Sequence, residues 1–155
     1  MADLLVGTTK GLFILEAGGG DDFCLTGPFC DGWPINHAVG QGGNVLAAGG
    51  GKWFGTGVWR REGGAWELSK GPFEGAEQLW SVCFDGTRLL AGSKPACLYE
   101  SRDGGRVWRR LDALTDQPGA DQWQPGAAGL VLHTILADGK GGVWVGISAD
   151  RKSVV

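Results

Sequence analysis

The chain has 155 residues, of which 30 are glycine and 8 are tryptophan, and its formal net charge is −3. This composition favours short strands joined by tight turns, and an apolar share of 43% excludes a disordered chain because it supplies a core. The mild acidity gives no electrostatic footprint for nucleic acid, and no apolar run approaches the roughly 20 residues that a membrane span requires.

Short apolar runs that end in glycine recur along the chain and predict one series of strands. They begin at Leu4, Val45, Leu89 and Val143, a period of roughly 40–50 residues that lengthens before the last run. Three further series keep the same order within each period. The preceding run begins at Ile35, Leu79 and Leu132, the following run near Gly11, Gly57 and Ala96, and the last run near Phe23, Trp66 and Trp108.

Four short strands in each such period are typical of a β-propeller blade. We therefore predict an all-β chain that forms an incomplete β-propeller. A β-sandwich also has short strands and glycine-rich turns, but it does not require the same order of motifs in every period. The predicted parts are three strands of blade one over residues 3–29, blade two over 33–73, blade three over 77–112 and the start of blade four over 130–149.

This count gives about three to four blades of a six- to eight-bladed propeller. We therefore expect residues 1–149 to be an N-terminal fragment, and we interpret residues 150–155 as a non-native tail. A fragment of this kind leaves strand edges unpaired. Because unpaired edges act as templates for pairing, we expect the fragment to self-associate through them.

Residues 101–108 fit the pattern Ser-x-Asp-x-Gly-x-x-Trp, which is called the Asp-box. Asp103 can accept hydrogen bonds from the turn that follows it, and Ser101 adds a short hydroxyl at the strand end. Gly105 can adopt a positive φ, and Trp108 can bury a large ring on the next strand. We expect these four residues to have a structural role.

The four cysteines, Cys24, Cys30, Cys83 and Cys97, have no Cys-x-x-Cys spacing. Reduced, buried thiols in a cytoplasmic protein are the favoured interpretation. A Cys24–Cys30 disulfide or a metal site is the alternative. The N-terminus enters a predicted strand directly, with no signal-peptide hydrophobic core, which also favours a cytoplasmic location.

With the blades placed, the chain resembles bacterial Asp-box (bacterial neuraminidase repeat) propeller proteins of the sialidase-like superfamily, which include WD40/YVTN-like repeat proteins. The matching segments are residues 5–13, 27–29, 35–38, 48–55, 101–108, 123–126 and 132–135. The resemblance implies the fold. Proteins with this repeat are often labelled glycosyl hydrolase or exo-alpha-sialidase because of the repeat and not because of an active site.

A sialidase-like enzyme would bind a carboxylate with three arginines and would use a Tyr–Glu pair and an acidic residue. The Phe/Tyr-Arg-Ile-Pro motif that usually supplies the first arginine is absent from this sequence. Tyr99, the only tyrosine, precedes the Asp-box and is expected to pack. We predict no catalytic residues, no metal site and no cofactor. A glycosidase completed by further blades is the alternative function.

The loops opposite the Asp-box turns form the predicted ligand face, which we call the top face. One lysine lies in each of three equivalent loops, and four aromatic residues lie in the same loops. Asn36 and two histidines lie near the start of innermost strands. The candidate residues are Lys10, Trp33, Asn36, His37, Lys52, Trp53, Phe54, Lys94, Trp123 and His133.

Each group of candidates has two interpretations. The lysines are solvated loop charges or surround an anionic ligand, and the aromatic residues stack on a sugar or protein ligand or pack between blades. The histidines line a common cavity as metal ligands or a general base, or they hold loops by hydrogen bonds. The long segment at residues 112–129 is predicted to be an ordered lid. The expected ligand is a carbohydrate or a protein.

Overall fold

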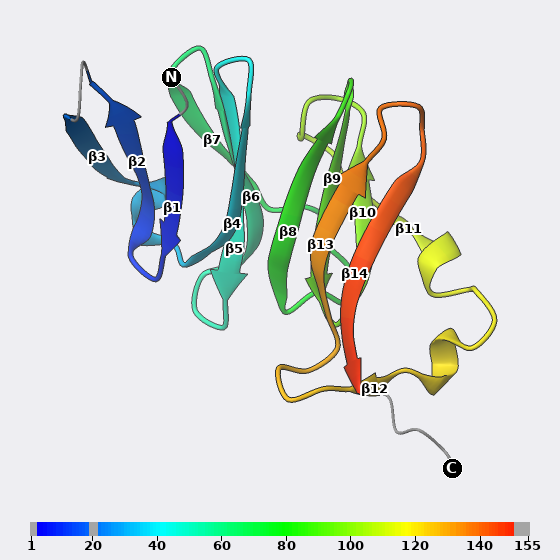
Figure 1. Ribbon diagram of the computed structural model, residues 1–155. Coiled ribbons are helices and arrows are strands. Elements are labelled where there is room, and N and C mark those ends of the chain that lie inside the picture. Colours follow the sequence, from blue (N-terminus) through cyan, green and yellow to red (C-terminus); the bar gives the residue numbers. More distant parts are fainter. Residues whose placement is uncertain (1–2, 19–21, 151–155) are drawn as a thin grey trace.

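The computed structural model describes residues 3–18 and 22–150, which form four antiparallel sheets (Figure 1). The prediction of an all-β chain is confirmed. The strands are β1 (Leu4–Thr8), β2 (Gly11–Ala17), β3 (Phe23–Phe29), β4 (Ile35–Gln41), β5 (Asn44–Gly51), β6 (Gly55–Glu62), β7 (Ala65–Ser69), β8 (Gln78–Asp85), β9 (Arg88–Lys94), β10 (Leu98–Ser101), β11 (Arg109–Leu111), β12 (Gln124–Pro125), β13 (Val131–Ala137) and β14 (Val143–Asp150). Residues 151–155, which belong to the predicted non-native tail, lie outside the described ranges.

The sheets follow one another along the chain. The first sheet has the order β1-β2-β3, the second β4-β5-β6-β7, the third β11-β10-β9-β8 and the fourth β12-β14-β13. In the second sheet, β4–β5 and β6–β7 are joined by the two-residue turns Gly42-Gly43 and Gly63-Gly64, in which all four glycines have positive φ. Such turns match the twist of antiparallel strands, and they explain why glycine pairs separate the apolar runs.

The strands β4, β8 and β13 share one irregularity. Each is hydrogen-bonded on one side only, and its register with the next strand shifts at Asn36, Trp80 or His133. A bulge of this kind adds one residue to a strand and changes the direction of the side chains beside it. The three bulges occupy equivalent places in the sequence repeat.

Side chains beside these bulges join neighbouring sheets. The Nδ2 of Asn36 donates to the carbonyl oxygen of Leu79 at 2.8 Å, and the hydroxyl of Ser81 donates to the carbonyl oxygen of Leu132 at 2.9 Å. Both acceptors lie on the edge strand of the following sheet. These bonds satisfy backbone groups that the edge strand would otherwise leave unpaired.

Two glycines permit the close approach of the sheets. A Cβ on Gly7 would lie 2.7 Å from the carbonyl oxygen of Ile35, and a Cβ on Gly92 would lie 2.4 Å from Cδ2 of Leu132. Both distances are shorter than van der Waals contact. A glycine at the end of the apolar run therefore allows the next sheet to pack directly on the backbone.

The core consists of three apolar clusters, one between each pair of successive sheets. The cluster between the second and third sheets contains Trp108, which is 1% exposed, and Tyr99. Phe73 contacts both rings, with centroid separations of 5.4 Å to each. The Tyr99 hydroxyl donates to the carbonyl oxygen of Glu74 at 2.7 Å, so this tyrosine is a packing residue.

Replacing Trp108 with Ala should lower the free energy of unfolding by about 3–5 kcal/mol, because it removes a buried ring and leaves a cavity. Urea denaturation followed by circular dichroism measures this change. The matched control is Val107→Ala, which truncates the exposed neighbour and should change stability by less than about 0.5 kcal/mol. Equal effects of the two substitutions would contradict the assigned packing.

Candidate ligand-binding face

The loops that carry most of the candidate residues lie at one end of the molecule. In Figure 1 the β1–β2 turn, the β5–β6 loop and β12 lie at its lower end. The strands β1, β5, β9 and β14 each occupy the same place in their sheets, next to the open edge or at it. This arrangement gathers the loops that follow β1, β5 and β9.

The three lysines differ in their surroundings. Lys10 and Lys52 are exposed, whereas Lys94 is half-buried at the end of β9. The Cε of Lys94 lies 2.8 Å from the position that a Cβ on Gly129 would occupy. Lys94 therefore packs under the segment that leads into β13, and only Lys10 and Lys52 present freely solvated side chains.

Trp33 is buried, with 6% of its surface exposed. Its ring contacts Trp59 edge-on at a centroid distance of 6.0 Å and Phe54 at 5.6 Å, and the Nζ of Lys70 lies 5.7 Å from its centroid. For this residue the interpretation as a ligand-stacking ring is wrong, because burial between the sheets leaves the ring no free face.

Trp53 has the opposite character, with 92% of its surface exposed. The loop that carries it is held on both sides. The N–H of Phe54 donates to the carbonyl oxygen of Gly51 at 3.1 Å, and the Phe54 ring rests on Trp33. An exposed aromatic ring on an anchored loop is a feature of binding surfaces, since it offers contact area at a low entropic cost.

The long connection between the third and fourth sheets is ordered by short elements. It contains the 3₁₀ turns η2 (Asp112–Leu114) and η3 (Ala120–Gln122), followed by half-buried Trp123 and by β12, which pairs with the end of β14. Figure 1 shows β12 beside the fourth sheet and the β5–β6 loop below the second. Trp53 and Trp123 therefore belong to the same end but to different sheets.

Both histidines line one cavity of about 400 Å³, together with Val82, Cys83 and other residues of β4, β8 and β13. The Nδ1 of His37 accepts a hydrogen bond from the N–H of Val82 at 3.2 Å, and burial lowers the pKa of His37. His133 is exposed, with its Nδ1 2.8 Å from the hydroxyl of Thr134.

Metal binding finds no support at these histidines. Within residues 3–18 and 22–150, no group of three or more His, Cys, Asp or Glu side chains is placed to hold a metal ion. The bond from Val82 also occupies one ring nitrogen of His37, and burial raises the pKa of Cys83, which disfavours its thiolate. His37 and Asn36 both act as hydrogen-bonding links to the third sheet.

In the described part of the chain the four cysteines are free thiols. Cys24 is exposed and Cys30 is buried, and burial raises the pKa of Cys30 to about 12. The free thiols agree with the interpretation as reduced cysteines, but the expectation that the thiols are buried is wrong for exposed Cys24 and for half-buried Cys83.

Most described arginines are engaged within the protein. Arg88, Arg102 and Arg109 surround Glu100, which is 1% exposed, and Arg60 pairs with Glu67. Burial opposes the charged form of Glu100, but hydrogen bonds from Arg102 and Arg109 keep the pKa of this carboxyl below its ordinary value. These guanidinium groups neutralise a buried carboxylate rather than forming a triad for a ligand.

The Asp-box residues form a closed network at the β10–β11 turn. Asp103 Oδ1 accepts bonds from the hydroxyl of Ser101 at 2.7 Å and from the N–H groups of Arg106 and Val107 at 3.0 Å each. The N–H of Gly105 donates to Ser101 Oγ at 2.9 Å, and Gly105 has a φ of 88°. The bonds to Asp103, led by the one from Val107, lower its pKa.

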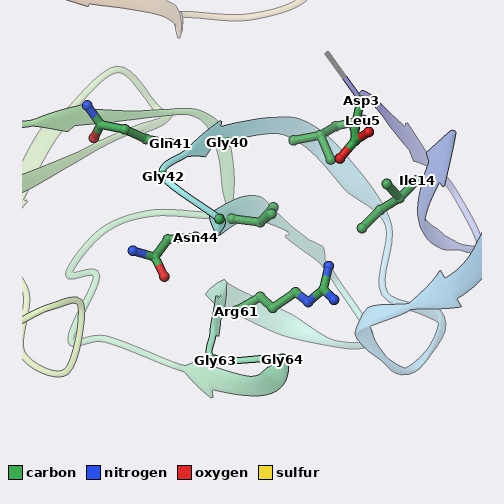
Figure 2. A pocket seen from close by; sticks show the side chains of 12 residues that line it. Asp3, Leu5, Ile14, Gly40, Gln41, Gly42, Asn44, Arg61, Gly63 and Gly64 are labelled. Atoms are coloured by element: carbon green, nitrogen blue, oxygen red, sulfur yellow. The ribbon is translucent and has the colours of Figure 1, made fainter. Parts of the chain in front are cut away.

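A cavity that the sequence analysis missed lies at the opposite end, between the first and second sheets (Figure 2). Its volume is about 760 Å³, and Arg61 extends into it from β6, with Asp3 and Leu5 on the other wall. Arg61 forms no ion pair with any residue in the described ranges. Successive side chains of β6 point to opposite faces, so Arg60 reaches Glu67 and Arg61 points to the other face. This alternation is the sequence signal that could have identified Arg61.

Neither a protein-family model nor a curated protein matches the chain. Among the residues that the structure describes, no helix has the length and apolar character needed to cross a membrane.

Lowering the pH should weaken the link at His37. The pKa of His37 is lower in the folded chain than in the unfolded chain. The stability that the neutral ring contributes is therefore complete above pH 6.5 and is lost as the pH falls below that value. The difference in unfolding free energy between the wild type and His37→Ala should therefore shrink from pH 8 to pH 5, as measured by urea denaturation.

Asn36→Ala is the matched control, because it removes a neighbouring link between the same two sheets and the amide does not titrate. The corresponding difference for Asn36→Ala should stay constant over this pH range. A constant difference for His37→Ala as well would show that the bond to Val82 does not depend on the neutral ring.

Proposed function

We propose that this chain is part of an Asp-box β-propeller that binds a carbohydrate or protein ligand at its top face, in the cytoplasm. The four sheets, their equivalent bulges and the recurrent packing between them support the proposed fold. The hydrogen-bonded turn at residues 101–108 supports membership of the Asp-box proteins. Catalysis is not part of the proposal, because most described arginines are engaged within the protein.

The exposed Trp53 is the observation that carries the proposed function. Trp33 is buried and Trp123 is half-buried, whereas Trp53 projects into solvent from an anchored turn beside Lys52. An indole face can stack on a sugar ring or fill a pocket of a protein partner, and the lysine adds attraction for an acidic group.

The separation of Trp53 from Trp123 indicates an extended ligand. The segments that carry the two residues belong to the second and fourth sheets at the same end, and the third sheet lies between those two sheets (Figure 1). A ligand that contacts both must span more than one sheet. An oligosaccharide or a protein surface meets this requirement better than a single small molecule.

Replacing Trp53 with Ala should weaken ligand binding by about 2 kcal/mol, roughly 30-fold, because the ring supplies the central contact. Binding of the purified chain to a microarray of defined oligosaccharides, and to immobilised cell extract, measures the change and distinguishes the two ligand classes. Trp123→Ala should reduce binding to the same ligand.

Val107→Ala serves as the control, since it truncates an exposed apolar side chain in the turn at the opposite end. Its binding should equal that of the wild type. Binding that survives both tryptophan substitutions would contradict the assignment of the ligand to this face.

A further inference from the structure

Three internal interfaces between successive sheets share one plan. A strand next to the edge of its sheet, or in the first sheet the edge strand β1, presents two residues, the second of them small, to the edge strand of the following sheet. The presenting pairs are Leu5 with Gly7, Leu46 with Ala48, and Leu90 with Gly92, and the receiving residues are Ile35, Leu79 and Leu132. The same contact therefore recurs each time one sheet packs on the next.

The fourth sheet offers a further presenting surface. Within β14, Val143 and Val145 pack inward on the third sheet, so Trp144 and Gly146 face the other way. Trp144 pairs across the strands with Leu136, and both side chains are 62% exposed. We call this surface, formed by Thr134, Leu136, Trp144 and Gly146, the tail face.

The first sheet has an exposed apolar surface on its outer side. Leu5 packs toward the second sheet, so Leu4 and Val6 face outward, and the register places four more apolar residues beside them. We call this surface the head face. It consists of Leu4, Val6, Phe13, Leu15, Phe23 and Leu25.

The two faces concentrate the exposed apolar surface of the described chain. Six of its nine exposed large hydrophobic residues lie on them: Leu4, Val6, Phe23, Leu25, Leu136 and Trp144. Neither face contains a charged residue. Contiguous apolar surfaces of this kind mark interaction sites, because leaving them in water is unfavourable.

We propose that two copies of this chain associate head to tail, with the tail face of each copy on the head face of the other. A single chain carries both halves of the contact. The tail face holds Trp144 and Gly146 at the places of the presenting pairs, and the head face receives them on β1, β2 and β3, because within the described residues the first sheet has no counterpart of the receiving strands β4, β8 and β13. The two faces differ, so each interface is heterologous, and a pair of such interfaces closes a two-fold dimer.

The size of the closed assembly agrees with the proposed fold. Each copy contributes four sheets, so the dimer has eight, which is within the range of about 4–8 blades of known propellers. The inference concerns the sheet faces and does not depend on the proposed ligand of the top face. Failure of ligand binding would therefore leave it unaffected.

Two substitutions test the contact by blocking one face each. Trp144→Asp places a charge on the tail face, and Leu25→Asp places a charge on the head face. Sedimentation velocity from about 1 to 100 μM should show a dimer for the wild type and a monomer for each variant, with association weakened at least about 30-fold.

Mixing the two variants provides the decisive measurement. Trp144→Asp retains an intact head face and Leu25→Asp retains an intact tail face, so an equimolar mixture should form a 1:1 pair through one interface. This pair should be weaker than the wild-type dimer, which has two. If the copies associated through two identical faces or through strand edges, mixing the two variants would not restore association.

The controls separate association from folding. Val107→Asp charges an exposed apolar residue outside both faces and should dimerise like the wild type. Near-ultraviolet circular dichroism checks that each variant is folded, and Leu136→Asp replaces Trp144→Asp if the latter unfolds. A monomeric wild type, larger oligomers, or a mixture that stays monomeric would each overturn the proposal.

Discussion

The close approach of neighbouring sheets at their edge strands is the constraint on which the structure depends. An edge strand leaves one row of backbone groups unpaired, and these groups are costly to bury without partners. Asn36 and Ser81 supply the missing hydrogen bonds from the preceding sheet, and glycine at positions such as Gly92 removes the side chain that would keep the backbones apart. The hydrogen bonds to the edge strand and the apolar packing between the sheets therefore occur at the same place.

This arrangement determines which residues remain available for binding. His37 and Asn36 lie near the proposed ligand face, but the Nδ1 of His37 and the Nδ2 of Asn36 already bond to the third sheet. Trp33 is committed to the core between the first two sheets, and it supports the loop that exposes Trp53. A rigid scaffold thus carries a short loop whose exposed ring is free for recognition, as in many binding proteins.

At the opposite end of the molecule, internal contacts hold the Asp-box turn and the residues beside it. The carboxylate of Asp103 gathers the N–H groups of its own turn, and Trp108 fills the core beneath it. Glu100 is neutralised by several arginines at the same edge of the third sheet. The cavity beside Arg61 offers an open, charged surface at this end, and it lies between the first and second sheets rather than at the Asp-box turn.

By itself, the sequence determined most of the strands and their order, because alternation and glycine placement are local properties of the chain. It did not predict the two-residue strand β12, which pairs with the end of β14. It also indicated the role of Asp103, whose partners lie within four residues. Only the tertiary structure decided that Trp33 is buried and Trp53 exposed, since the first meets Trp59 and the second meets no neighbouring ring. The same holds for Lys94, which is covered by a segment distant in sequence, because burial depends on what other sheets bring to a residue.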